Sequence, residues 1–219
     1  MFFEKIANNS NAASLAARLR RKCFGLFLTL LSKVERPLTI LDIGGTVQFW
    51  EVMGFDDFAD VEITVLNVGE CSPSATRIKC VQGNALALNF PDQFFDIIFS
   101  NSVVEHVGNL DAQCQMAKEI RRVAKRYFVQ TPNKNFFLEP HFHFPYSQFF
   151  PVRLRVWLLM RFDLGWYKKE PDETRARKEV EEVRLLTQKE FHALFPGSTL
   201  YKEKILGLKK SFVAYAGWE

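Results

Sequence analysis

The stretch that decides the fold is LTILDIGGTVQFW, residues 38–50. Its apolar run, 38–43, carries one acid, Asp42, near its end and is followed by Gly44 and Gly45. Such a run is typical of a buried strand in a parallel sheet. Glycine lets the chain turn sharply and lets a ligand approach the backbone closely. Because ligands of open α/β sheets bind beyond the carboxyl ends of the strands, we expect a binding site at this turn.

The rest of the chain repeats the same rhythm. Apolar runs at 61–68, 77–83, 94–102 and 126–133 predict four further strands, with a helix at 110–124 between the last two. Near-continuous apolar strands separated by crossovers indicate a parallel sheet covered by helices on both faces. Residues 199–217 predict a C-terminal antiparallel hairpin around a tight Gly207–Leu208 turn. We therefore expect an α/β fold with a doubly wound, mostly parallel, seven-stranded sheet.

Length and composition favour a single domain that does not bind nucleic acid. The 219 residues are 47% hydrophobic, and the net charge of +4 comes from basic residues scattered among acids. A nucleic-acid surface would concentrate that charge on one face, so we expect no such partner. The four cysteines form no C-x-x-C pair, the start lacks a secretory pattern and no apolar run is long enough to span a membrane. We expect a cytoplasmic protein.

The N-terminal segment 1–35 is predicted to hold one helix, at 11–33. Its leucines and phenylalanines form a broad apolar stripe, and Arg18, Arg20 and Arg21 lie on other faces. Packing across the sheet is the favoured interpretation. Peripheral membrane contact by a basic amphipathic helix, or a cover over the substrate pocket, is the alternative.

The glycine turn is not built for phosphate. The sequence GGTVQF lacks the third glycine of a dinucleotide fingerprint, and the chain has no phosphate-binding P-loop. The carboxylate of Asp42 would repel a phosphate and attract an ammonium or another cation. The turn therefore suits a positively charged cofactor without phosphate.

Four segments together carry a resemblance to a known family. LDIGGT, VLNVGE, VQGNALALNFPDQFFDIIFSNSVVEHV and RVAKRYFVQTPN follow one another within 38–133. In this order and spacing they resemble the class I S-adenosylmethionine-dependent methyltransferases. The resemblance implies a Rossmann-like fold, S-adenosyl-L-methionine as cofactor and methyl transfer as the activity.

The resemblance also assigns cofactor-binding roles. Asp42, Gly44, Gly45 and Thr46 would hold the methionine part, Asn67 the ribose, Asn84 with Ala85 the adenine, and Ser100 with Asn101 the methionyl side. Asn67 and Asn84 stand where the family usually has acids, and the glycine loop is shorter than usual. A neutral hydrogen bond contributes about 0.5–1.5 kcal/mol and a charged one about 1.5–3 kcal/mol, so each amide weakens binding by roughly tenfold. A methyltransferase fold that only binds a partner is therefore the leading alternative, ahead of a nicotinamide-dependent oxidoreductase.

The chain divides by function into a cofactor-binding half at 38–133, a substrate lid at 134–185 and a C-terminal helix and hairpin at 186–219. A base is needed only if the acceptor is a hydroxyl or a protonated amine. The candidates are His141 first, then His143 and His106, and the expected substrate-facing residues are Glu105, Glu139, Phe142 and Tyr146.

The string EPHFHFP, 139–145, has more than one interpretation. In an extended segment residues two apart face the same side, so Glu139, His141 and His143 would converge. They could be structural, orient substrate and accept its proton, or chelate a metal; a metal is not expected. The lid is rich in phenylalanine, which favours a small apolar or aromatic acceptor, methylated at oxygen rather than nitrogen. A sugar or lipid-linked acceptor stays open, as does the oligomeric state.

Overall fold

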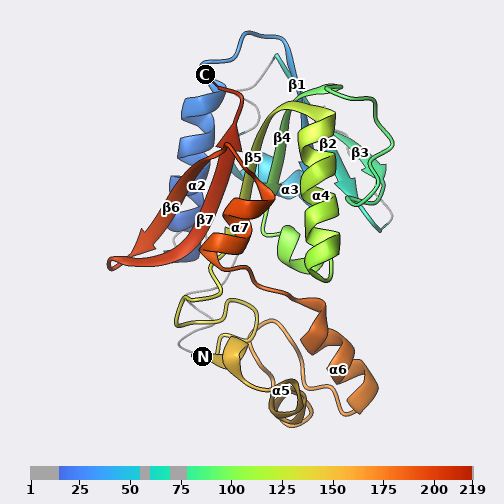
Figure 1. Cartoon of the computed structure of the whole chain (residues 1–219), viewed down its shortest axis with the longest axis vertical. Coiled ribbons are helices and arrows are strands. Elements are labelled where there is room, and N and C mark those ends of the chain that lie inside the picture. The colour runs from blue at the N-terminus through green and yellow to red at the C-terminus, as the bar shows by residue number, and fades with distance from the viewer. Residues whose placement is uncertain (1–14, 55–59, 70–77, 219) are drawn as a thin grey trace.

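The computed structural model describes residues 15–54, 60–69 and 78–218, with side chains from Lys22 onward. Its centre is one seven-stranded sheet with the order β3-β2-β1-β4-β5-β7-β6 (Figure 1). The strands are β1 (Leu38–Ile43), β2 (Val61–Asn67), β3 (Lys79–Gln82), β4 (Phe95–Asn101), β5 (Ala124–Pro132), β6 (Thr199–Ile205) and β7 (Leu208–Ala216). This is the predicted α/β fold.

The pairing pattern places the glycine turn at the centre of the sheet. Strands β1 to β5 pair in parallel, whereas β7 runs antiparallel to both β5 and β6. Strand β1 lies between β2 and β4, so the chain crosses from one half of the sheet to the other beside β1. This reversal of strand order is where open α/β sheets bind ligands.

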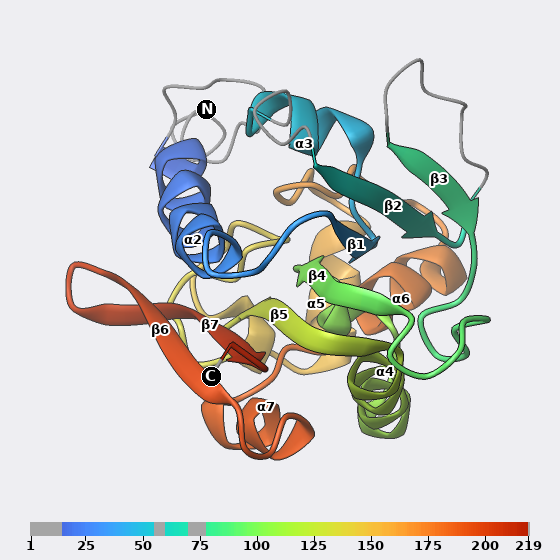
Figure 2. The same ribbon diagram turned by 90° about the horizontal axis from the view of Figure 1, so that it is seen from above.

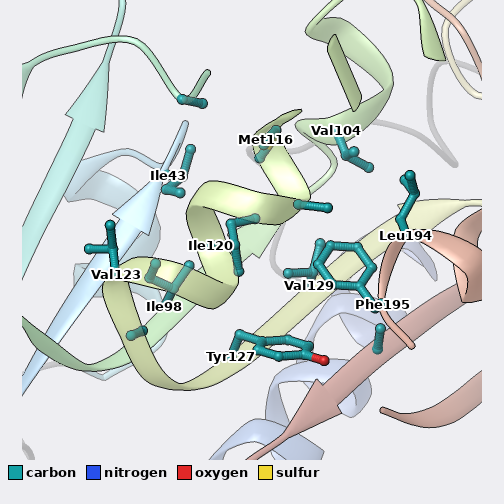
Figure 3. Packing of buried hydrophobic residues seen from close by; sticks show 14 of the residues in the cluster. Ile43, Ile98, Val104, Met116, Ile120, Val123, Tyr127, Val129, Leu194 and Phe195 are labelled. Atoms are coloured by element: carbon teal, nitrogen blue, oxygen red, sulfur yellow. The ribbon is translucent and has the colours of Figure 1, made fainter. Parts of the chain in front are cut away.

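Helices cover both faces of the sheet, as expected. Figure 2 shows α2 (Leu15–Leu31) and α3 (Val47–Val52) on one face, with α4 (Leu110–Val123) and α7 (Gln188–Leu194) on the other. Figure 3 shows the core on the α4 and α7 side, where Met116, Ile120 and Phe195 pack against the strands. The opposite core is an aromatic cluster made of Phe24, Phe27, Phe49, Trp50, Phe99 and Phe128.

Helix α2 packs across the sheet, which is the favoured one of its two interpretations. Phe24, Phe27, Leu30 and Leu31 are all buried, and Phe27 has its ring centroid 4.9 Å from that of Phe99 in β4. These apolar side chains therefore face the sheet. The predicted start of the helix, from residue 11, lies outside the described residues.

The C-terminal hairpin is present, but its turn is displaced by one residue from the prediction. Leu206 and Gly207 are the central residues, with φ of 48° and 82°. A two-residue type I′ turn needs positive φ at both central positions, and its twist matches that of the two strands. The predicted Gly207–Leu208 turn is wrong because Leu208 already pairs with Ile205 as the first residue of β7.

The lid between β5 and α7 has a small core of its own. It contains a short 3-10 helix, η3 (Ser147–Phe149), and the helices α5 (Val152–Leu159) and α6 (Glu173–Glu182). Five buried side chains form its core: Phe142, Val156, Leu159, Ala176 and Val180. Since β5 leads directly into it, the lid lies at the carboxyl ends of the parallel strands (Figure 1).

Two further expectations concern the cysteines and the membrane. Cys23 and Cys114 are free, but Cys80 is disulfide-bonded, which departs from the expected set of reduced thiols. None of the helices in the described part of the chain has the length and apolar character needed to cross a bilayer.

Candidate active site at the carboxyl ends of β1 and β4

The turn after β1 requires both of its glycines, for different reasons. Gly44 has φ of 74°, its N–H donates to the Leu66 carbonyl at 2.8 Å, and a Cβ added to it would lie 2.6 Å from Val103 Cγ2. A Cβ added to Gly45 would lie only 1.6 Å from Asp42 Oδ2. The turn is therefore folded directly onto the carboxylate that precedes it.

Asp42 lies beneath this turn and is 1% exposed. Its Oδ2 accepts a hydrogen bond of 2.7 Å from Trp50 Nε1, whereas its Oδ1 has no hydrogen-bond partner among the described residues. Burial raises the pKa of Asp42 to about 7, and the Trp50 hydrogen bond opposes that rise. The indole of Trp50 thereby orients the carboxylate.

The other expected cofactor residues lie along the same edge of the sheet, and several already have internal partners. The Asn67 amide donates to the Gly45 carbonyl at 2.9 Å, which leaves its own oxygen available to a ligand. Asn84 is exposed, and its Oδ1 accepts from the Leu86 N–H at 2.9 Å, which leaves its NH₂ group for an adenine. Thr46 caps α3 by accepting from the Phe49 N–H.

The remaining three residues expected to bind the cofactor are Ala85, which is buried, and Ser100 and Asn101 at the end of β4. Ala85 and Ser100 are buried, and Ser100 Oγ is 3.5 Å from the Ile43 carbonyl. Asn101 Oδ1 accepts from Ser102 Oγ at 3.4 Å. Ser100 and Asn101 follow β4 to its carboxyl end, next to the glycine turn.

These residues fit a cationic nucleoside better than a nucleotide. The unpartnered buried oxygen of Asp42 can receive an ammonium group, and the free oxygen of Asn67 can accept from a ribose hydroxyl. A phosphate would meet a carboxylate instead of a row of free amides. The donor set therefore fits S-adenosylmethionine.

A second polar group lies next to the glycine turn. Val103, which contacts Gly44, leads into the 3-10 turn η2 (Val104–His106). Glu105 is fully buried; its Oε2 accepts from Thr131 Oγ1 at 3.0 Å, and its Oε1 has no hydrogen-bond partner in the described ranges. His106 is exposed, and its Nε2 lies 3.2 Å from Nε2 of His141 in the lid. We call Glu105, His106 and His141 the histidine group.

Glu139 orients His141. It is 4% exposed, and it accepts from the His141 N–H at 2.8 Å, from His141 Nδ1 at 2.7 Å and from the Phe142 N–H. Because these bonds fold 139–143 into a turn, the expected extended segment is wrong. Glu139 and His141 converge, but His143 has its ring 5.3 Å from that of Trp166 instead.

The environment separates the pKa values of these groups. Burial raises the pKa of Glu105 to about 7. Although the residue is exposed as a whole, partial desolvation of its imidazole, together with the nearby His141, lowers the pKa of His106 to about 4. Burial alone would lower the pKa of His141, but the hydrogen bond and charge of Glu139 raise it above its usual value. His141 is thus the member of the pair that holds a proton more strongly.

The remaining predicted substrate residues do not join this group. Phe142 is buried in the lid core, with its ring 5.1 Å from that of Tyr167. Tyr146 is 56% exposed, with φ of 61°. Thr131, the hydrogen-bond partner of Glu105, was not identified from the sequence; only its place at the carboxyl end of a predicted strand pointed to it.

Two hollows lie outside the glycine turn. A cavity of about 150 Å³ is lined by Glu139 itself, together with Lys134, Arg155 and Arg184 among others. It is smaller than the roughly 300–1,000 Å³ of ordinary ligand pockets. A hollow of about 540 Å³ between α7 and β6 is shallow and lined by Gln188, Lys189, His192, Leu200 and Lys202. Because β6 is the edge strand and β1 lies in the middle of the sheet, this hollow is not part of the site at the glycine turn.

Comparison with known proteins agrees with this geometry. The family model described as a methyltransferase domain matches residues 41–127, from the middle of β1 into β5. The matched residues, less than half of the chain, are similar to a methyltransferase domain. The family match supports S-adenosylmethionine as its cofactor, and no curated protein matches the sequence.

Two solved structures share this fold over most of the chain. A Pyrococcus horikoshii protein is 15% identical, with a TM-score of 0.54 over 98% of this chain and 96% of the other. A S-adenosylmethionine-dependent methyltransferase from Methanosarcina mazei is 17% identical, with a TM-score of 0.50 over 85% and 95%. A candidate sarcosine dimethylglycine methyltransferase from Galdieria sulphuraria is 18% identical, with a TM-score of 0.43 over 58% and 51%, so the chain spans about half of that protein.

Proposed function

We propose that this protein transfers the methyl group of S-adenosylmethionine to a small organic acceptor. One observation carries the proposal. The methyltransferase-domain match includes the glycine turn that folds over Asp42, a buried acid with one oxygen left without a partner among the described residues. In this proposal that oxygen would receive the ammonium of the cofactor's methionine part. Gly44 in the turn lies against Val103, which leads into the histidine group.

The reaction needs little from the protein beyond alignment and removal of one proton. When bound, the cofactor would supply a methyl group on a positively charged sulfur. Transfer to the acceptor oxygen would form a C–O bond and break the C–S bond, whose electron pair would stay on sulfur. The proton of the acceptor leaves at the histidine group, where Glu139 fixes the ring of His141. Oxygen is favoured over nitrogen as the methylated atom because two histidines, His106 and His141, are available to accept the proton of a hydroxyl group.

The lid surface supports an apolar acceptor. Its exposed aromatic side chains, each 40–56% accessible, are Phe137, Phe144, Tyr146, Phe149, Trp157, Phe162 and Trp166. Of these, Trp157 and Phe162 are in ring contact, with centroids 6.5 Å apart, and exposed aromatic side chains that adjoin one another can bind apolar compounds. We propose an aromatic compound as the acceptor, with a sugar or a lipid-linked intermediate as the second choice. The proposed location of the protein is the cytoplasm.

A binding protein without turnover is the second candidate, and one observation favours it. Asn67 and Asn84 replace acids, and each already has an internal hydrogen bond. Both amides would therefore bind the nucleoside more weakly than acids at these positions would.

The test is methyl transfer by the full-length protein from cofactor carrying a labelled methyl group to a panel of phenols, amines and sugars. We expect a labelled phenolic ether. We expect His141→Ala to lower kcat by about 10²-fold or more, the usual contribution of a general base, with cofactor affinity unchanged. His192→Ala, on the far helix α7, is the matched control. Cofactor binding without transfer to any acceptor would favour the binding protein, and equal kcat in His141→Ala would remove that residue from the reaction.

A further inference from the structure

The histidine group has the geometry of a metal chelate. Glu105, His106 and His141 each offer one ligand atom, and these atoms all lie within 4.8 Å of one another. The two Nε2 atoms are 3.2 Å apart. Two imidazoles bound to one tetrahedral zinc ion at about 2.0–2.1 Å have nitrogens about 3.4 Å apart. The histidine pair is therefore already near the spacing of a chelate, and the carboxylate needs to approach by roughly 1–2 Å.

The carboxylate supplies a second, independent observation. Glu105 is fully buried, and only its Oε2 has a hydrogen-bond partner, Thr131. A buried carboxylate oxygen without a donor costs free energy unless a proton or a cation satisfies it. The histidine nitrogens nearby mark the place where a cation would do so.

Glu139 completes the arrangement as an outer support. Metal-bound histidines commonly donate their second ring N–H to a carboxylate, which fixes the ring and makes the ligand nitrogen more basic. Here His141 Nδ1 lies 2.7 Å from Glu139 Oε1, so Nε2 is the nitrogen left to face His106. Glu139 is itself held by two backbone N–H groups. From the sequence, the only chelating set considered was Glu139, His141 and His143, and no metal was expected.

We propose that Glu105, His106 and His141 bind one divalent transition-metal ion in a site of the two-histidine, one-carboxylate type. Three protein ligands leave coordination positions open, as in catalytic metal sites. An acceptor hydroxyl bound there would lose its proton more easily. This role in the reaction rests on the proposed function and changes one step of it. With the ion bound, the coordinated histidine nitrogens would not accept the proton of the acceptor, which would leave to water instead. Metal binding itself does not rest on it.

The test is a Zn²⁺ titration of the full-length protein after treatment with a chelator, read by competition with a chromophoric chelator. We expect one tightly bound Zn²⁺ per chain. His106→Ala, at an exposed position, should weaken binding by about 100-fold or more, since it removes one of three ligands. Glu139→Gln should weaken it by about 10–100-fold, as loss of an outer support does. His192→Ala is the matched control and should bind as the wild type does.

Wild-type protein that binds no Zn²⁺, or His106→Ala that binds it as tightly as the wild type, overturns the proposal. In the first case a shared proton is what joins the two imidazoles. Cofactor binding measured on the same samples separates the two proposals. Cofactor binding without Zn²⁺ binding leaves the proposed function standing, and Zn²⁺ binding without cofactor binding leaves only the metal site.

Discussion

The buried carboxylate beneath the glycine turn makes a direct prediction about stability. Asp42 is 1% exposed, and burial raises its pKa from 3.8 to about 7 in the folded protein. The folded state thus binds the proton more tightly than the unfolded chain does. Stability is therefore greatest below the unfolded pKa, and it falls as pH rises toward the folded pKa. Asp42→Asn removes this titration and keeps an oxygen that can accept from Trp50.

The size of the effect follows from the shift. A shift of roughly three units at about 1.4 kcal/mol each gives a full cost on the order of 4 kcal/mol. Between about pH 5 and about pH 7.5, about 2–3 kcal/mol of this should be lost in the wild type. Glu105 adds a loss of the same sign, but it is common to both proteins. The difference between the two pH profiles therefore isolates Asp42.

Urea unfolding of the wild type and the variant at these two pH values measures the difference. We expect the variant to lose about 2–3 kcal/mol less free energy of unfolding over the interval. Asp60→Asn, at an exposed aspartate, is the control and should follow the wild type. Parallel profiles for wild type and Asp42→Asn would show that Asp42 titrates as it does in water, and the reasoning about its burial would be refuted.

Three more predictions follow from the same structure. Trp50→Phe keeps the aromatic cluster but removes the hydrogen-bond donor to Asp42, so it should lower the free energy of unfolding by about 1–3 kcal/mol, most at high pH, where Asp42 is ionised. Urea unfolding at two pH values measures this loss, and a loss that is largest at low pH would contradict the prediction. Cofactor binding should release a proton near neutral pH, because an ammonium group beside Asp42 favours the ionised form of that carboxyl. Calorimetry in buffers of different ionisation enthalpy detects the released proton, and equal heats in all buffers would contradict a contact between the ammonium and Asp42. Leu206→Asn should stabilise the protein by about 0.5–1 kcal/mol, because Asn tolerates the left-handed turn position that Leu206 occupies at 97% exposure; a lowered thermal midpoint would contradict the turn assignment.

The sheet was predictable because its signals are local. The apolar run 38–43 matches β1 residue for residue, and β2, β4 and β5 differ from their predicted bounds by at most two residues at either end. The predicted start of β3, residue 77, lies outside the described residues. Periodicity and glycine positions act within a few residues, so one sequence suffices to read them. The hairpin turn was displaced because Leu206 takes a positive φ that its residue type disfavours.

The site was only partly predictable because its contacts join distant segments. The sequence pointed to Asp42, His106 and His141, but not to the hydrogen bond from Trp50 or to the approach of the two imidazoles, which lie 35 residues apart. His143 was misplaced because Glu139 caps two backbone N–H groups and turns the chain. Such a turn depends on burial of that carboxylate within the lid, which no local pattern reports.

The central claim is that the glycine turn after β1 is the seat of S-adenosylmethionine, and Gly45 tests it most directly. A Cβ at this position meets Asp42 Oδ2 at 1.6 Å, whereas one at Gly25 meets no atom within 4 Å in the described part of the chain. Calorimetric titration of the folded proteins should show cofactor binding in the wild type and Gly25→Ala, and a loss of at least about tenfold in Gly45→Ala, since about 1.4 kcal/mol of lost contact suffices. Equal affinity in all three proteins, or none in the wild type, would contradict the claim.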